Sequence, residues 1–193
     1  MRKWESEIHL LIVAWIATWL GGCKAPFTQP KFMSPAFNIS EIDIVYVMPP
    51  LEFSSQSMKL LDQDIWKAAK IRLREKGYRF ICLQDKSLVY DIKREEFSKP
   101  NSTVFANIGP PEARWLLFFV WYENLELTGF TMKNGQIARR EYTPAFELSA
   151  YLFDRSKGEL IWSNSTRMGR RLPIDAIFFA TIQNIDGLPN KNE

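Results

Sequence analysis

An uninterrupted apolar stretch from Trp115 to Tyr122 sets the strongest limit on the fold of this chain. All eight of its residues are aliphatic or aromatic, whereas a helix that spans a bilayer needs about 20 such residues. A strand that is apolar on both faces must also be covered on both faces, as the central strands of layered sheets are. The stretch therefore predicts a central strand with other structure packed on either side of it.

The segment before this stretch predicts a βαβ unit. Residues 42–48 form an apolar strand pattern that ends at Pro49–Pro50, and residues 78–83 form a second one. Between them, apolar residues recur at helical spacing, and Gly77 stands where a left-handed glycine commonly ends a helix. Two strands joined by a helix in this way run parallel to each other.

The segment after the central strand predicts an antiparallel meander and a last helix. Asn134–Gly135 is a hairpin turn signal, residues 142–154 form the return strand, and residues 156–158 turn again into a strand over 159–166. Residues 173–184 have one apolar side at helical spacing. The predicted fold class is α/β (α+β): a βαβ unit followed by an antiparallel meander, in one mixed sheet of about five strands with helices packed on it.

The residue inventory excludes most kinds of catalytic site. The single histidine, His9, lies in the N-terminal apolar run, so the rest of the chain has no imidazole for a Ser-His or Cys-His pair or for a zinc site. Cys82 lies in an apolar strand and is expected to be a core thiol. Acidic neighbours such as Glu123 and Glu126 are common on ordinary surfaces, whereas a glycosidase needs two carboxyls at a set separation across a cleft. We therefore expect no enzyme, catalytic residue, metal or cofactor.

The N-terminal segment has the features of a secretory signal. Arg2 and Lys3 precede a mostly apolar run of 13 residues, from Ile8 to Leu20, which is too short to span a bilayer. The run ends in Leu20-Gly21-Gly22-Cys23, which resembles the bacterial lipobox. That resemblance implies cleavage between Gly22 and Cys23 and lipidation of Cys23. An ordinary or uncleaved signal peptide is the alternative.

The lipobox resemblance also predicts where the protein resides. More than one acyl chain on Cys23 would hold the protein on a membrane, since each buried methylene contributes about 0.8 kcal/mol. Lys24, in a place where an Asp retains such proteins in the inner membrane, favours the outer membrane, with the protein facing the periplasm.

The chain divides into four predicted segments. Residues 1–22 are a lipoprotein signal peptide, 23–41 are the lipidated cysteine with a flexible tether, 42–189 are a single α/β domain, and 190–193 are a polar tail. The tether contains prolines and shows no strand or helix period. Its phenylalanines either dock on the domain or dip into the lipid interface, or else they become ordered on a partner: Phe27, Phe32 and Phe37. The net charge of +3 is only mildly basic, whereas nucleic-acid binding usually needs a concentrated basic patch, so no nucleic-acid partner is expected.

The order of elements from Ile42 to Trp162, together with the hairpin Asp154–Trp162, resembles one group of proteins. These are the small periplasmic lipoproteins related to the curli-secretion lipoprotein CsgG, to the N-terminal domain of TolB and to activators of penicillin-binding proteins. Members often carry Gly-Ala-Asp before the central strand, where this chain has Ala113-Arg114-Trp115. The resemblance implies no catalytic residues, and Trp162 is expected to be a packed core indole.

Five arginines are the candidate partner-binding residues. They follow the hairpin turn and the last strand, and they could lie near one another at one end of the sheet: Arg139, Arg140, Arg167, Arg170 and Arg171. Such a patch would bind an acidic partner, phospholipid head groups or peptidoglycan carboxylates. The alternative is that they are solvated loop arginines without a partner.

Two classes of function follow from these observations. The first is a lipid-anchored, non-catalytic accessory protein that binds and positions or regulates an envelope assembly, in secretion or cell-wall synthesis, through another envelope protein. The second is a periplasmic carrier of a lipid or small ligand, which requires an apolar pocket under Trp115, Trp121 and Trp162. The sequence makes no prediction of oligomeric state.

Overall fold

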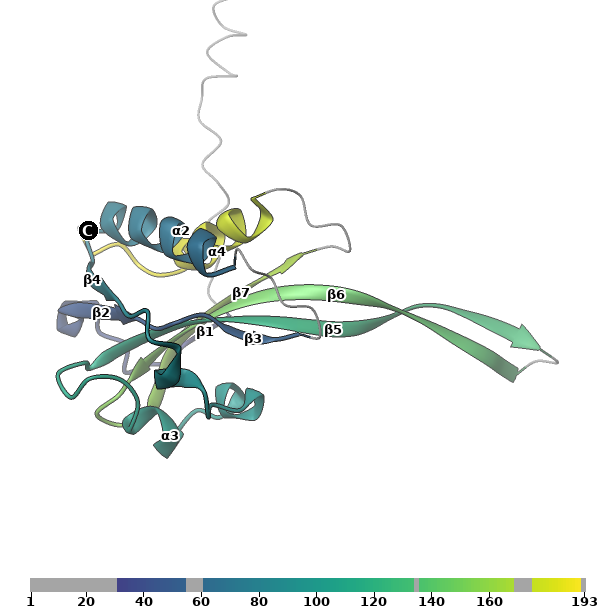
Figure 1. Cartoon of the computed structure of the whole chain (residues 1–193), viewed down its shortest axis with the longest axis horizontal. Coiled ribbons are helices and arrows are strands. Elements are labelled where there is room, and N and C mark those ends of the chain that lie inside the picture. Colours follow the sequence, from purple (N-terminus) through teal and green to yellow (C-terminus); the bar gives the residue numbers. More distant parts are fainter. Residues whose placement is uncertain (1–30, 55–60, 134–135, 169–174, 192–193) are drawn as a thin grey trace, which may run out of the picture.

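A computed structural model describes residues 31–54, 61–133, 136–168 and 175–191 of the chain. They form one seven-stranded mixed sheet in the order β1-β7-β6-β5-β2-β4, in which β3 also pairs with β5 (Figure 1). The strands are β1 (Phe32–Met33), β2 (Ile44–Val47), β3 (Leu51–Phe53), β4 (Arg79–Cys82), β5 (Trp115–Lys133), β6 (Gln136–Asp154) and β7 (Glu159–Met168). Two longer helices cover one face: α2 (Leu61–Glu75) and α4 (Ala176–Asp186). Short helices cover the other face: η2 (Lys86–Val89), η3 (Arg94–Ser98) and α3 (Thr103–Ala106).

The topology confirms the predicted fold class. β2 runs parallel to both β4 and β5, and β5, β6 and β7 form the antiparallel meander. The sheet has seven strands rather than about five, because β1 and β3 were not anticipated. Pro49–Pro50 does interrupt β2, as prolines cannot donate to the ladder. After the prolines, the chain pairs with β5 again as β3. Val47 pairs with Leu117 and Leu51 pairs with Val120, so the segment that contains the prolines has one residue more than β5 between these pairs, as in a β-bulge.

The central strand is covered on both faces, as its sequence predicts. All residues from Trp115 to Tyr122 are buried. Alternate side chains enter two different cores, one beneath α2 and α4 and the other beneath η2, η3 and α3. Position along β5 therefore determines which layer a side chain faces.

The helix before β4 ends as predicted. Gly77 has a left-handed φ of 81°, and Tyr78 N–H donates to the Leu73 carbonyl at 2.9 Å. β4 lies at the edge of the sheet rather than in its interior, so Ile81 is 43% exposed. Cys82 is accordingly only partly buried, although it packs against the core. Burial raises the pKa of the Cys82 thiol more than Lys70 lowers it, which keeps the sulfur protonated.

Residues 31–41, expected in the tether, lie on the domain. β1 pairs with β7, and Ser34 N–H donates to the Ile161 carbonyl at 2.9 Å. Phe37 packs against the core beneath the helices. This residue therefore docks on the domain, as one of the alternatives for the tether phenylalanines predicts. The free edge of β7 offers the unpaired backbone groups that β1 satisfies. Signal residues 1–22, the lipidation position Cys23 and the tether up to residue 30 lie outside the described residues.

Candidate functional site: an extended arm and the cleft at its base

The strands β5 and β6 continue beyond the body of the sheet as a two-stranded arm (Figure 1). Among the described residues, β3 accompanies β5 only as far as Tyr122, and β7 accompanies β6 only from Phe146 onwards. We call residues 124–133 and 136–145 the arm. Ten residues of extended strand, from Asn124 to Lys133, give it a length of about 33 Å. The predicted turn at Asn134–Gly135 lies outside the described residues, but Lys133 pairs with Gln136 on either side of it.

The arm has one apolar and one polar face. Paired residues on neighbouring antiparallel strands share a face, which assigns the apolar face the pairs Leu125–Pro144, Leu127–Tyr142, Phe130–Arg140 and Met132–Ile137. The polar face carries the pairs Asn124–Ala145, Glu126–Thr143, Gly129–Glu141, Thr131–Arg139 and Lys133–Gln136. The larger hydrophobic side chains of the apolar face are between 51% exposed (Ile137) and 70% exposed (Leu125).

Two register shifts keep the apolar face continuous. One lies between Leu127 and Gly129 on β5, and the other lies between Thr131 and Met132, where β6 holds one extra residue. Each extra residue reverses the face on which the following residues of its own strand lie. Without the shifts, Phe130, Met132 and Ile137 would lie on the face opposite Leu125 and Leu127. The shifts therefore explain why the sequence shows no simple alternation here and why the apolar face was not anticipated.

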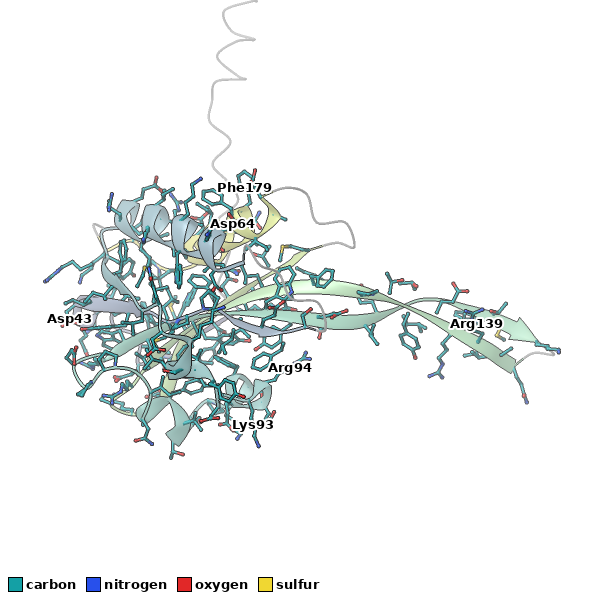
Figure 2. All side chains as sticks on the ribbon, in the orientation of Figure 1. Asp43, Asp64, Lys93, Arg94, Arg139 and Phe179 are labelled. Carbon is teal, nitrogen blue, oxygen red and sulfur yellow. The ribbon has the colours of Figure 1, made fainter. Side chains whose placement is uncertain are left out.

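A cleft of about 420 Å³ lies at the base of the arm, on the side of η3. The Arg94 guanidinium carbon lies 4.8 Å from the centre of the Tyr122 ring, and Arg94 Nη2 donates to Asn124 Oδ1 at 2.7 Å (Figure 2). The hydroxyls of Tyr122 and Tyr151 are 3.2 Å apart. Burial raises the pKa of Tyr122, and Tyr151 raises it further. The cleft thus presents the Arg94 cation and two tyrosine hydroxyls, and the raised pKa keeps that of Tyr122 protonated.

The described chain starts at this same place. Lys31 Nζ donates to Glu147 Oε1 at 3.0 Å, and Glu147 also lines the cleft. Burial raises the pKa of Glu147, but hydrogen bonds from Lys31, Ser165 and Ser149 together outweigh it and hold that pKa below its ordinary value. The carboxylate therefore stays ionised and joins the N-terminal segment to the arm base.

Replacing Lys31 by methionine is expected to lower the free energy of unfolding by about 0.5 kcal/mol near neutral pH, since the lysine is largely exposed and screened by solvent. Because the folded pKa of Glu147 is lowered, this contribution is complete above about pH 4.5 and is lost as the pH falls through the folded pKa. Urea unfolding at neutral and acid pH measures it. Lys157→Met removes an equal charge elsewhere and is the control. A difference that persists in strong acid would contradict the assignment.

The five candidate arginines are not brought together among the described residues. Arg139 lies far out on the arm (Figure 2). Arg140 is the next residue along β6 and lies on the opposite face. Arg167 lies on β7 opposite Glu147 and forms an ion pair with Glu126. Eight residues separate Arg139 from Glu147 along β6, a distance of about 26 Å. Arg170 and Arg171 lie outside the described residues. The expected proximity assumed a shorter hairpin.

The acidic neighbours on β5 do not form a catalytic pair. Glu123 and Glu126 lie on opposite faces of the sheet, because their pairing partners Phe146 and Thr143 do. Glu123 Oε2 accepts a hydrogen bond from Ser54 at 3.1 Å, and Glu126 pairs with Arg167. In the part of the chain that the structure describes, no group of three or more His, Cys, Asp or Glu side chains could hold a metal ion.

The three tryptophans beneath which a ligand carrier would need space are themselves packed in the core. Trp115 Nε1 donates to the Glu41 carbonyl at 3.1 Å, and Trp162 Nε1 donates to the Gly187 carbonyl at 3.0 Å. Trp121 is fully buried and stacks on Phe146 at 5.2 Å between ring centres. Trp162 is thus the packed core indole that was expected, and the cleft lies on the opposite face of the sheet.

No helix within residues 31–54, 61–133, 136–168 and 175–191 has the length and apolarity needed to cross a bilayer.

The fold and its arm define a mixed-sheet α/β domain, and comparison with known proteins gives distant similarities only. No protein-family model matches the chain, and no curated protein matches it. A dodecamer of PelC from Paraburkholderia phytofirmans is 16% identical, with a TM-score of 0.44 over 81% of this chain and 93% of that one. Lipoprotein GNA1162 from Neisseria meningitidis is 15% identical, with a TM-score of 0.37 over 66% and 83% of the two chains. A putative neuraminyllactose-binding hemagglutinin homolog from Helicobacter pylori is 12% identical, with a TM-score of 0.38 over 74% and 81%.

Proposed function

We propose that this chain is a lipid-anchored, non-catalytic accessory protein of the bacterial envelope. In this proposal Cys23 carries the lipid, and the arm with the cleft at its base binds another envelope protein and positions it close to the membrane. The observation that carries the proposal is the position of Lys31, which contacts Glu147 at the base of the arm and directly precedes the paired strand β1.

The length of that segment supports the proposal. Eight residue steps separate Cys23 from Lys31, and a fully extended chain spans at most about 3.6 Å per residue, or about 29 Å. The arm is about 33 Å long. A lipid on Cys23 would therefore keep the base of the arm within one arm length of the membrane surface, whichever way the domain turned.

The chemistry of the arm and cleft suits a protein partner. Both arm strands have edges without a neighbouring strand among the described residues, and such edges can accept an added strand from a partner. The cleft offers the Arg94 guanidinium, two tyrosine hydroxyls and the Glu147 carboxylate. These groups bind peptide carbonyls, amides and charged side chains. The resemblance of the Asp154–Trp162 hairpin to envelope lipoproteins favours a secretion or cell-wall assembly as the source of that partner.

The Cys23→Ser variant is expected to abolish labelling of the protein by an alkyne fatty acid in bacterial cells, whereas the wild-type protein is labelled. A photo-crosslinking residue in place of Glu95, which lines the cleft, is expected to capture an envelope protein, at a yield that falls at least severalfold when Cys23 is replaced.

The control places the same crosslinker at Lys70, an exposed position on the outer side of α2, where little capture is expected. Equal acyl labelling of wild-type and Cys23→Ser protein would contradict the lipid anchor. Equal capture from positions 95 and 70 would contradict the cleft as the partner site.

A further inference from the structure

The apolar face of the arm is an exposed hydrophobic surface on an otherwise ordinary domain. Its largest members contribute to none of the buried cores and are more than half exposed: Leu125, Leu127, Phe130, Met132, Ile137 and Tyr142. An isolated two-stranded hairpin is only marginally stable in water, and contiguous exposed apolar patches mark interaction sites. Two register shifts maintain this face along the arm, so its composition is not a by-product of a regular strand pattern.

We propose that the apolar face of the arm docks into the interfacial layer of a lipid membrane. The proposal rests on the lipid anchor proposed above, because the N-terminal segment leaves the body beside Glu147 at the arm base. With Cys23 within about 29 Å of that point, the anchor would hold the arm near the membrane surface. The domain would then turn so that the apolar face, which lies on the other side of the ribbon from Glu147, meets lipid.

The charge of the arm fits an anionic lipid surface. The distal part of the arm, residues 129–133 and 136–141, contains three basic residues, Lys133, Arg139 and Arg140, and one acidic residue, Glu141. Its net charge is therefore +2. Each basic residue near an anionic leaflet contributes about 1 kcal/mol of attraction. Arg140 lies within the apolar face opposite Phe130, where the long stem of an arginine can cover apolar surface while its guanidinium reaches the head groups.

The shape of the face favours a lipid surface over a second copy of the chain. Eight residues of a two-stranded ribbon form a narrow strip of about 26 Å by 10 Å, from the strand rise and spacing. A protein that is already membrane-bound needs only a modest additional contribution from such a strip, whereas two copies joined through it alone would have to offset the whole cost of association with it.

The arm would lie flat at head-group depth and not deeper. Its strand edges leave backbone N–H and C=O groups without a strand partner among the described residues, and such groups cannot be buried in hydrocarbon without a large cost. An interfacial position lets Phe130, Met132 and their neighbours enter the acyl boundary. The polar face, with Glu141 and Thr131, stays in water.

The test uses a chain that begins at residue 23 and carries Cys23→Ser, so that no acyl chain contributes; it keeps every residue of the described domain. Its binding to vesicles of phosphatidylethanolamine with a minor fraction of phosphatidylglycerol is measured by co-sedimentation. Replacing Leu127, Phe130 and Met132 by serine is expected to weaken binding on the order of 100-fold.

Matched variants separate the apolar and charge contributions. Serine at Thr131, Gln136 and Thr143, on the polar face, is expected to leave binding unchanged. The double variant Arg139→Gln, Arg140→Gln is expected to weaken binding about 30-fold on phosphatidylglycerol-containing vesicles, and to have no effect on pure phosphatidylcholine.

A second measurement does not depend on how the serine variant folds. An environment-sensitive fluorophore is attached to Met132→Cys or to its neighbour Thr131→Cys, each in a Cys82→Ser background. These positions lie on opposite faces of the arm. Vesicles are expected to shift the emission of the first to the blue and to leave the second unchanged.

Three outcomes of the vesicle experiments would overturn the proposal. They are no vesicle binding by the unlipidated chain with Cys23→Ser, equal binding by the two serine variants, and equal emission shifts at the two labelled positions. Self-association without vesicles that the apolar-face variant abolishes would also overturn it, and would identify a second copy as the occupant. Because the chain used has no lipid, failure here leaves the anchor on Cys23 standing, and that anchor has its own test by acyl labelling.

Discussion

Replacing Trp162 by alanine is expected to lower the free energy of unfolding by about 4 kcal/mol. The indole is fully buried, and its Nε1 donates to the Gly187 carbonyl, just beyond the end of α4. Removing it would leave a cavity between β7 and α4 and a buried carbonyl without its donor. Urea unfolding followed by circular dichroism measures the change.

A phenylalanine pair separates packing from the hydrogen bond. Trp162→Phe keeps a ring but loses the bond to Gly187, so a loss of about 2 kcal/mol is expected. Trp121→Phe is the matched change, because Trp121 is equally buried and its Nε1 has no hydrogen-bond partner within the described residues. Its expected loss is about 1 kcal/mol, since only packing is removed. Equal losses for the two phenylalanine variants would contradict the assigned role of the Trp162 bond.

The hairpin that carries the family resemblance stabilises the fold. Asp154 is buried, accepts the Ser156 N–H at 3.0 Å and pairs with Arg114 at 3.2 Å. Trp162 holds α4. The burial of Trp162 is predicted by the sequence, whereas the pairing of Asp154 with Arg114 and of Trp162 with Gly187 depends on the tertiary fold. These structural roles explain why the resemblance predicts the fold and says little about the partner.

The arm was only partly predictable because its signal depends on register. Asn134–Gly135 indicated the hairpin, but the strands on either side appeared shorter than they are. The bulges at Thr128 and Ala138 break the alternation that marks an amphipathic strand. The same longer hairpin carries Arg139 and Arg140 away from Arg167, so these three of the five candidate arginines are spread along the sheet and the arm.

The unanticipated strands have a different cause. β1 has two residues and β3 has three, too few to show a period. Each exists because a neighbouring strand presents an open edge, the edge of β7 for β1 and the edge of β5 beyond β2 for β3. Such pairings depend on tertiary structure, which a local pattern does not contain.

Replacing Gly158 by alanine is expected to lower the free energy of unfolding by about 3 kcal/mol. Gly158 has a φ of 63°, which costs alanine about 1 kcal/mol. An added Cβ would also lie 2.5 Å from the backbone oxygen of Ser102. That residue must then move, which weakens the 2.9 Å bond from Ser102 N–H to the Gly158 carbonyl and the adjoining bond from Leu160 N–H to Pro100, each worth about 1 kcal/mol.

Gly109→Ala is the control, because Gly109 shares the positive φ, at 78°, but its added Cβ would meet no atom closer than 3.5 Å. It is expected to lose only about 1 kcal/mol, and equal losses at the two glycines would contradict the role of the Ser102 contact.

The effect of Gly158→Ala should also reach the cleft. Ser102 Oγ donates to Glu96 in η3 at 2.6 Å, and η3 holds Arg94 over Tyr122. Faster amide exchange in η3 at conditions where the domain stays folded would show that the turn at Gly158 also orders the cleft at the arm base.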